Sequence, residues 1–180
     1  KGVRLACQVK VKNDIEVLIS PDLLFAQEFK AVVVKILDLT ADIKHVVLKL
    51  DDPSTISFKP GQYVQFKIPE TDEFRAYSIA SQPSQNNTMD LIVRLVPGGM
   101  CSSYIHEVLD LNDKIALTGP FGDFYLREDS ARDIICIGGG CGMAPIRSIL
   151  LHLKEKNMPR KVTYFFGARS KKDLFFTEEL

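Results

Sequence analysis

Two short stretches decide the fold of this chain: Arg75-Ala76-Tyr77-Ser78 and, sixty residues later, Gly138-Gly139-Gly140-Cys141-Gly142. The first ends a region of short apolar runs, and the second lies between an apolar strand and an amphipathic helix. Glycine lets the backbone turn sharply and approach a bulky ligand, and the N–H groups of a following helix can face a phosphate. The order predicts a β-rich domain followed by a nucleotide-binding one.

The region around the first stretch reads as a series of short strands. After the turn signal Pro60-Gly61, the side chains of Val64, Phe66 and Ile68 fall on one face of an alternating strand. Several such strands at close spacing predict a small antiparallel barrel or sandwich. Strands are expected at residues 31–37, 43–50, 63–68, 75–80, 90–96 and 114–118, with one helix at 102–109.

The pattern changes after residue 122. Residues 133–137 form a continuous apolar run, as expected of a parallel strand covered on both faces. An amphipathic helix from about Met143, a second strand at 161–166 and a second helix starting near Lys172 should follow. This sequence of elements predicts the first half of a doubly wound α/β domain.

The glycine loop does not have the usual GxGxxG spacing, so a simple tight turn remains an alternative at this point. Pro145 fits the first turn of the following helix, where its missing N–H costs nothing. The tip of the next strand, residues 167–172, has no acid before Asp173. Arg169 there could accept the extra phosphate of NADP or could be a solvated side chain, and the sequence leaves both open.

The first stretch is chemically suited to a flavin. Arg75 offers a charged fork to a phosphate, Tyr77 a flat surface, and Ser78 a small hydroxyl on the opposite strand face. Residues 98–103, two glycines followed by hydroxyls at a helix start, could seat a second phosphate. An edge strand and ordinary helix capping are the structural alternatives.

The chain resembles the ferredoxin–NADP reductase superfamily from about Phe29 onward. Within it, the chain is most similar to NADH-dependent reductases with a plant-type ferredoxin domain in front, namely oxygenase reductase components and the F-type component of sodium-translocating NADH:quinone reductase. The motifs that carry the resemblance are Phe58-Lys59-Pro60-Gly61-Gln62-Tyr63, Arg75-Ala76-Tyr77-Ser78, Gly99-Met100-Cys101-Ser102, Gly119-Pro120-Phe121-Gly122, residues 138–145 and Gly167-Ala168-Arg169-Ser170.

The resemblance implies an FAD-binding antiparallel barrel at residues 26–125 and part of an NAD(P)-binding domain at 126–180. Residues 1–25 would be the tail of a ferredoxin-like domain and a linker, with Cys7 as the fourth ligand of a 2Fe–2S cluster held only by the full-length protein. The cofactors would be FAD and NADH, or NADPH. Because a cysteine-glycine motif of the family would lie beyond Leu180, we expect the chain to be a piece of a longer protein.

The resemblance also assigns roles to residues. Arg75, in the motif with Ala76, would contact the FAD pyrophosphate, Tyr77 would pack on the isoalloxazine, and Ser78 would hydrogen-bond N5, the hydride acceptor. Tyr77 and Ser78 are therefore the predicted catalytic pair. Three groups complete the predicted cofactor-binding set: Ile92, Val93 and Arg94 along the ribityl and phosphate side of the flavin; Gly99, Met100, Cys101 and Ser102 over its phosphates; and Gly138, Gly139, Gly140, Cys141, Gly142, Met143, Ala144, Pro145 and Arg169 at the nicotinamide dinucleotide.

Bulk properties exclude several classes of protein. The 23 basic residues balance the 23 acidic ones, so no net field recruits nucleic acid. No apolar run reaches the roughly 20 residues of a membrane span, and the four cysteines form no CxxC pair. We expect a reducing, cytoplasmic location for this segment, whether or not the full-length protein is membrane-associated.

The sequence therefore predicts an oxidoreductase module that passes electrons from NAD(P)H through FAD to an iron–sulfur cluster and a partner protein. An alternative is a non-catalytic flavin-binding electron-transfer subunit of a larger dehydrogenase, and a third is a fragment that binds nothing. The sodium-pump relative carries a long insertion between its equivalents of Ile68 and Arg75, where this chain has only residues 69–74. A soluble relative is therefore favoured over the sodium-pump component itself.

Overall fold

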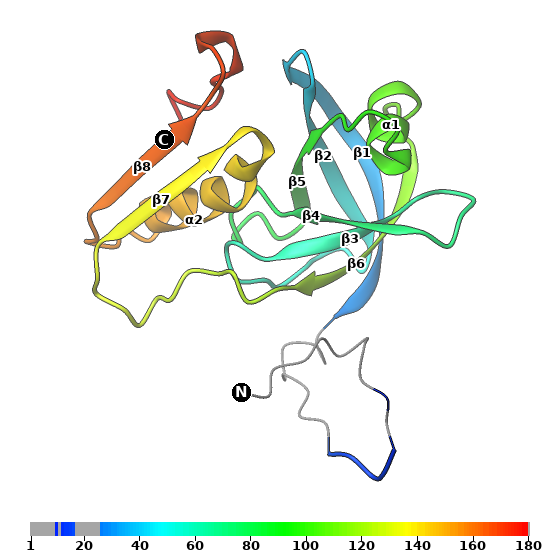
Figure 1. Cartoon of the computed structure of the whole chain (residues 1–180), viewed down its shortest axis with the longest axis horizontal. Helices are drawn as coiled ribbons and strands as arrows, with labels where there is room; N and C mark the ends of the chain where they lie inside the picture. The colour runs from blue at the N-terminus through cyan, green and yellow to red at the C-terminus, as the bar shows by residue number, and fades with distance from the viewer. Residues whose placement is uncertain (1–9, 11, 17–25, 180) are drawn as a thin grey trace.

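The computed structural model describes residues 10, 12–16 and 26–179. Residues 26–179 form two lobes side by side, a six-stranded antiparallel sheet with helix α1 and a two-stranded parallel sheet with helix α2 (Figure 1). The expected Cys7 ligand lies outside the described residues. The elements are β1 (Gln27–Thr40), β2 (Ile43–Asp52), β3 (Tyr63–Lys67), β4 (Phe74–Ser78), β5 (Thr88–Arg94), α1 (Met100–Glu107), β6 (Lys114–Phe121), β7 (Ile134–Gly139), η3 (Gly140–Gly142), α2 (Met143–Glu155), β8 (Val162–Gly167) and η4 (Lys171–Asp173).

The six strands are ordered β4-β3-β6-β1-β2-β5, and every pairing is antiparallel. The two edge strands approach each other, because Ile79 forms a bridge with Leu91 just after β4 ends. The sheet is therefore curled into the barrel-like form that the short, closely spaced strands predict. This curl places the end of β4 beside β5, where the two predicted flavin-contacting stretches meet.

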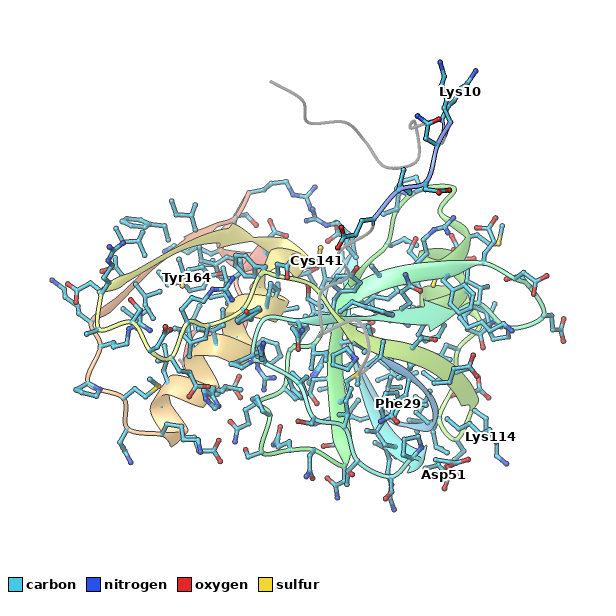
Figure 2. All side chains as sticks on the ribbon, turned by 90° about the horizontal axis from the view of Figure 1, so that it is seen from below. Lys10, Phe29, Asp51, Lys114, Cys141 and Tyr164 are labelled. Atoms are coloured by element: carbon cyan, nitrogen blue, oxygen red, sulfur yellow. The ribbon has the colours of Figure 1, made fainter. Side chains whose placement is uncertain are left out.

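The alternating strand pattern places the core inside this curl. Val64, Phe66 and Ile68 are at most 3% exposed, while Tyr63, Gln65 and Lys67 are intermediate. Figure 2 shows Phe29, one of the largest fully buried side chains, within this lobe. The alternation of apolar and polar residues in the sequence thus correctly predicts which face of β3 is buried.

The second lobe differs from the prediction in two respects, the first of which is the cover of its sheet. Strand β7 is not covered on both faces, since Ile135 and Ile137 are 70% and 78% exposed. Phe165 of β8, on the same open face, is 58% exposed. Helix α2 packs on the other face through Ile146, Ile149 and Leu153, and nothing in the described part of the chain lies over the open one.

The expected second helix is also absent from the described residues. The segment starting near Lys172 forms only the short 3₁₀ turn η4, closed by a capping box in which Asp173 and Ser170 bond each other's backbone N–H groups. No helix of the described residues is long and apolar enough to cross a bilayer.

Candidate functional site

A cavity of about 660 Å³ lies where the two lobes meet. Its walls come from β4, from the segment that leads into α1, from β5 and from the glycine loop before α2. Figure 2 places Cys141 of the glycine loop between the two lobes. The structure therefore brings three separate motifs of the sequence to one cavity.

The β4 wall carries the predicted Arg75, Ala76, Tyr77 and Ser78, all of which line the cavity. Strand pairing on β3 holds them, with Tyr77 opposite Val64 and Ser78 opposite Tyr63. The guanidinium of Arg75 bonds Glu73, with 2.7 Å between Nη2 and Oε2, so a carboxylate neutralises it. A phosphate at this wall would compete with that exposed, weak ion pair.

Tyr77 is half-buried, and its ring packs edge to face against that of Phe66, with 6.3 Å between the ring centroids. Burial and the polar contact with Cys101 raise the pKa of Tyr77 above its ordinary value. Burial likewise raises the pKa of the Cys101 thiol, against the opposing influence of Tyr77 and Arg75. Both groups therefore remain protonated and neutral at pH 7.

The α1 wall contains Gly98, Gly99, Met100, Cys101 and Ser102. Helix α1 begins at Met100 after Gly99, with no side-chain cap, so its first N–H groups have no capping partner. The Ser102 hydroxyl accepts from the Val96 N–H at 3.1 Å and so ties the loop to the helix. A methyl group on Gly99 would come within 2.7 Å of Ser102 Oγ, so the tight turn itself requires glycine there.

On β5, Ile92 and Arg94 line the cavity, whereas Val93 is fully buried in the core. Arg94 Nε lies 3.2 Å from Asp42 Oδ2 in the β1–β2 turn. The hydrogen bond from Thr40, joined by the charges of Arg94 and Arg169, lowers the pKa of Asp42. Both arginines predicted to hold flavin phosphates are thus paired with carboxylates.

The glycine loop forms the wall that faces β4. Cys141, Gly142, Ala144 and Pro145 line the cavity, and Pro145 occupies the first turn of α2 as predicted. Gly138 and Met143 pack inward instead: a methyl group on Gly138 would come within 2.7 Å of Ile146, and Met143 is 1% exposed. The glycine loop therefore serves both helix packing and the cavity.

The remaining predicted residues meet at a second cavity of about 370 Å³ at the carboxyl ends of β7 and β8. Gly139, Gly140 and Arg169 line it together with Arg94 and Asp173. Arg169 Nη2 lies 3.4 Å from Asp42 Oδ2, and its Nε lies 3.9 Å from Asp173 Oδ2. Arg94 therefore borders both cavities and links them.

The cavity residues fit a flavin dinucleotide next to a nicotinamide dinucleotide. Two guanidinium groups, the free N–H groups at the start of α1 and a hydroxyl on β4 provide donors for phosphates and a polar ring edge. A methyl group on Gly142 would meet no atom within 4 Å, so open space faces this backbone. Among the described residues, no group of three metal-ligating side chains comes together.

Sequence reasoning missed several residues at the site. Glu73 and Val96 line the larger cavity, and Asp42 bridges Arg94 and Arg169 across the lobes. Glu73 directly precedes β4 and stands two positions before Arg75, a spacing that could have indicated the ion pair. Asp42 is distant from both of its partners in sequence, so no local signal identifies it.

Comparison with known families agrees with this site. Residues 30–125 match the family described as Oxidoreductase FAD-binding domain, and residues 136–180 match Oxidoreductase NAD-binding domain. The chain belongs to the ferredoxin reductase-type family of FAD- and NAD-binding oxidoreductases, as the sequence motifs predict.

Its relatives include the reductase component of propane 2-monooxygenase from Mycolicibacterium goodii, which is 38% identical over 86% of this chain and 44% of the relative. The F-type component of the Na(+)-translocating NADH-quinone reductase of Shewanella putrefaciens is 34% identical over 98% of this chain and 71% of the relative. Among solved structures, the Amycolatopsis cytochrome P450 reductase GcoB superposes with a TM-score of 0.79 at 30% identity, over 86% of this chain and 47% of that one. The chain spans between 40% and 44% of the length of the first oxygenase reductase relatives.

Proposed function

We propose that this chain is the flavin-binding part of a reductase that passes electrons from NADH through FAD to an iron–sulfur cluster and a partner protein. The observation that carries the proposal is the single cavity that joins the 75–78, 98–102 and 141–145 stretches. The family match and the names of the oxygenase reductase relatives support it.

Each wall has a proposed task in binding FAD. Arg75 and the N–H groups at the start of α1 hold the phosphates, and Arg94 holds the phosphate side from β5. Tyr77 gives the isoalloxazine a flat, neutral surface, and Ser78 donates to or accepts from N5. The flavin, when bound, supplies the hydride and single-electron chemistry, while these residues only hold and orient it.

The loop at 138–145 is proposed to hold the nicotinamide dinucleotide against the opposite wall. Arg169 at the second cavity is the predicted residue whose role differs between NADH and NADPH, because only NADPH carries a 2′-phosphate for it to bind. Because Asp42 and Asp173 both lie within 4 Å of this guanidinium, a 2′-phosphate would have to displace carboxylates. We therefore propose that NADH is preferred to NADPH.

The direct test of the function uses the protein loaded with FAD under anaerobic conditions. Addition of NADH should abolish the flavin absorbance at about 450 nm, and an added one-electron acceptor should restore it. A protein that binds FAD but is bleached by neither NADH nor NADPH would instead be the non-catalytic flavin-binding component. A protein that takes up no FAD would refute both functions.

The nucleotide preference has its own test. The ratio of kcat/KM for NADH to that for NADPH should exceed one in the wild type and should fall in Asp42→Asn. The change removes a negative charge beside Arg169 without changing the shape of the side chain. An unchanged ratio would show that Arg169 does not face the 2′ position.

The partner and the location are proposals of the same kind. The relatives are named as reductase components of propane and phenol monooxygenases and as part of a quinone reductase, which supports an oxygenase or quinone reductase partner. Cys101, Cys136 and Cys141 are free thiols, which supports a reducing compartment such as the cytoplasm.

A further inference from the structure

A buried arginine on α2 connects the two lobes next to the cavity. Arg147 is 7% exposed, and its Nη1 donates to the Ala80 carbonyl at 2.9 Å and to Asp90 Oδ2 at 3.0 Å. Its Nε and Nη2 donate to the two carboxylate oxygens of Glu179 at 2.8 and 2.7 Å. Four directed bonds therefore fix the plane and position of this guanidinium.

The neighbouring residues extend the connection. Ser148, the next residue on α2, donates its hydroxyl to the Ser81 carbonyl at 2.7 Å. The Ser81 hydroxyl accepts from the Asp90 N–H at 3.2 Å, and the Ala80 N–H donates to the Asp90 carbonyl at 2.8 Å. Helix α2, the 80–81 segment and β5 are thus joined in one buried hydrogen-bond network.

This network reaches three walls of the cavity within two residues each. Ala80 follows Ser78 by two positions, Asp90 precedes Ile92 by two, and Arg147 follows Pro145 by two. A shift of α2 along β5 would therefore change the separation of the glycine loop from the 75–78 wall. The network therefore lies where it can fix the distance between the glycine loop and the 75–78 wall.

Aromatic packing shields the network from water. The ring of Phe176 lies over the guanidinium, 4.6 Å from its central carbon, and meets the His45 ring edge to face at 5.4 Å. His45 is 6% exposed, and its Nε2 lies 3.1 Å from Asp90 Oδ2. In such surroundings any movement that breaks one of these bonds would leave a buried charge unpaired, which is energetically costly. The guanidinium therefore resists displacement.

Stability alone does not explain a buried arginine here. Apolar side chains of similar size often give equal or greater stability than a buried ion pair. What they lack is direction, because apolar packing tolerates sliding whereas a guanidinium fork bonds only in its own plane. The chemistry of the group therefore points to control of geometry.

We propose that Arg147 is a positioning residue that, through Asp90 and Ala80, fixes the nicotinamide loop relative to the flavin wall. The inference rests on the proposed function, because it assigns the two walls to the two cofactors. It predicts that loosening the network slows hydride transfer while FAD binding is retained. A misplacement of about 1 Å between reacting groups can cost roughly a hundredfold in rate.

The test compares Arg147→Lys with wild type, both loaded with FAD. Lysine keeps the charge but loses the fork. We expect the rate of flavin reduction at saturating NADH to fall roughly ten- to a hundredfold, with FAD content unchanged. The long-wavelength absorbance that nicotinamide and isoalloxazine rings produce in contact should weaken as well, a readout that a purely structural role would not move.

Arg160→Lys is the matched control. Arg160 also uses its guanidinium, donating from Nε to the Arg132 carbonyl at 2.8 Å and from Nη1 to the Arg127 carbonyl at 3.0 Å, but these bonds lie at the surface and Arg160 lines neither cavity. Its rate and absorbance band should equal those of wild type. A control as slow as Arg147→Lys would overturn the specific role of Arg147.

A double variant covers the case in which Arg147→Lys does not fold. Arg147→Met combined with Asp90→Leu removes the directed bonds without leaving a lone buried charge. The proposal requires this protein to bind FAD and to be reduced slowly. Wild-type rates in either Arg147 variant would overturn the inference alone, whereas a wild-type protein that NADH does not reduce would overturn the proposed function and the inference with it.

Discussion

Substitutions at Gly142 should affect ligand binding without affecting folding. It has φ −63° and ψ −9°, which any residue adopts, and a methyl group there would meet nothing within 4 Å. The fold therefore does not require glycine at this position, although Gly142 lines the large cavity. If the loop exists to let a dinucleotide approach the backbone, a side chain at 142 should harm binding and leave folding intact.

The expected magnitudes follow from the backbone and the open space. Gly142→Ala at a helix-compatible position should stabilise the protein by about 0.4 to 1 kcal/mol, or about 1 to 4 °C in Tm for a chain of this size. Gly142→Leu should weaken the binding of the nicotinamide nucleotide by roughly ten- to a hundredfold, which is the loss expected when one hydrogen bond to a charged group is removed.

Gly139 is the contrasting position on the same loop. A methyl group there would come within 2.5 Å of the Gly167 carbonyl oxygen of the paired strand. Gly139→Ala should therefore destabilise the protein, by about 1 to 3 kcal/mol. The pair of variants distinguishes a glycine that packing requires from one that a ligand requires.

The assay combines thermal unfolding with the concentration dependence of flavin reduction by NADH. The predicted pattern for Gly142→Leu is a Tm no lower than wild type together with a raised KM for NADH. A Gly142→Leu protein with wild-type KM would refute the assignment of this loop. A large loss of Tm in Gly142→Ala would refute the interpretation of its backbone.

Three further predictions follow from other residues. Ser78→Ala should slow flavin reduction in stopped-flow absorbance with little change in Tm, and an unchanged rate would contradict its contact with N5. Asp90 has a lowered pKa because the contacts with His45 and Arg147 outweigh the effect of burial. Its contribution to stability is therefore present above the unfolded-state pKa of 3.8 and is lost as the pH falls through the lower pKa of the folded state. Acid unfolding curves of wild type and Asp90→Asn should therefore converge at low pH. Gly61→Ala should lower Tm strongly, because Gly61 has φ +110° and a methyl group would come within 2.5 Å of the Phe124 carbonyl oxygen.

Most of the first lobe could be predicted because its signals are local. The alternation at 63–68 determines which face of β3 is buried, and turn residues such as Pro60-Gly61 mark where it begins. The bridge between Ile79 and Leu91, which joins the sheet edges, has no such local signal. Long-range pairing of this kind depends on the curl of the whole sheet.

The errors in the second lobe have a physical reason. An apolar run such as 133–137 predicts a strand with both faces covered, but the run itself does not specify what covers them. In the described chain only α2 does so, and Ile135 and Ile137 remain exposed. The residues around Lys172 resemble a helix start, yet Ser170 and Asp173 satisfy each other within a single 3₁₀ turn.

Most of the predicted site residues line one of the two cavities, and they could be identified because their motifs combine in an order that carries a chemical signal, above all glycines beside helix starts. The ion pairs among them were not predictable. Arg147 looks like a polar residue on an amphipathic helix, and only the packing of α2 against β5 shows that it is buried. Residues that connect distant segments need the fold before their roles can be recognised.

The cavity between the lobes is proposed to hold FAD against β4. Structure determination of the protein loaded with FAD would locate the flavin without further inference. Isoalloxazine density is expected beside Tyr77 and Ser78, with the phosphates at Arg75 and the start of α1. Flavin density elsewhere on the molecule, with Arg75 still bonded to Glu73, would contradict it.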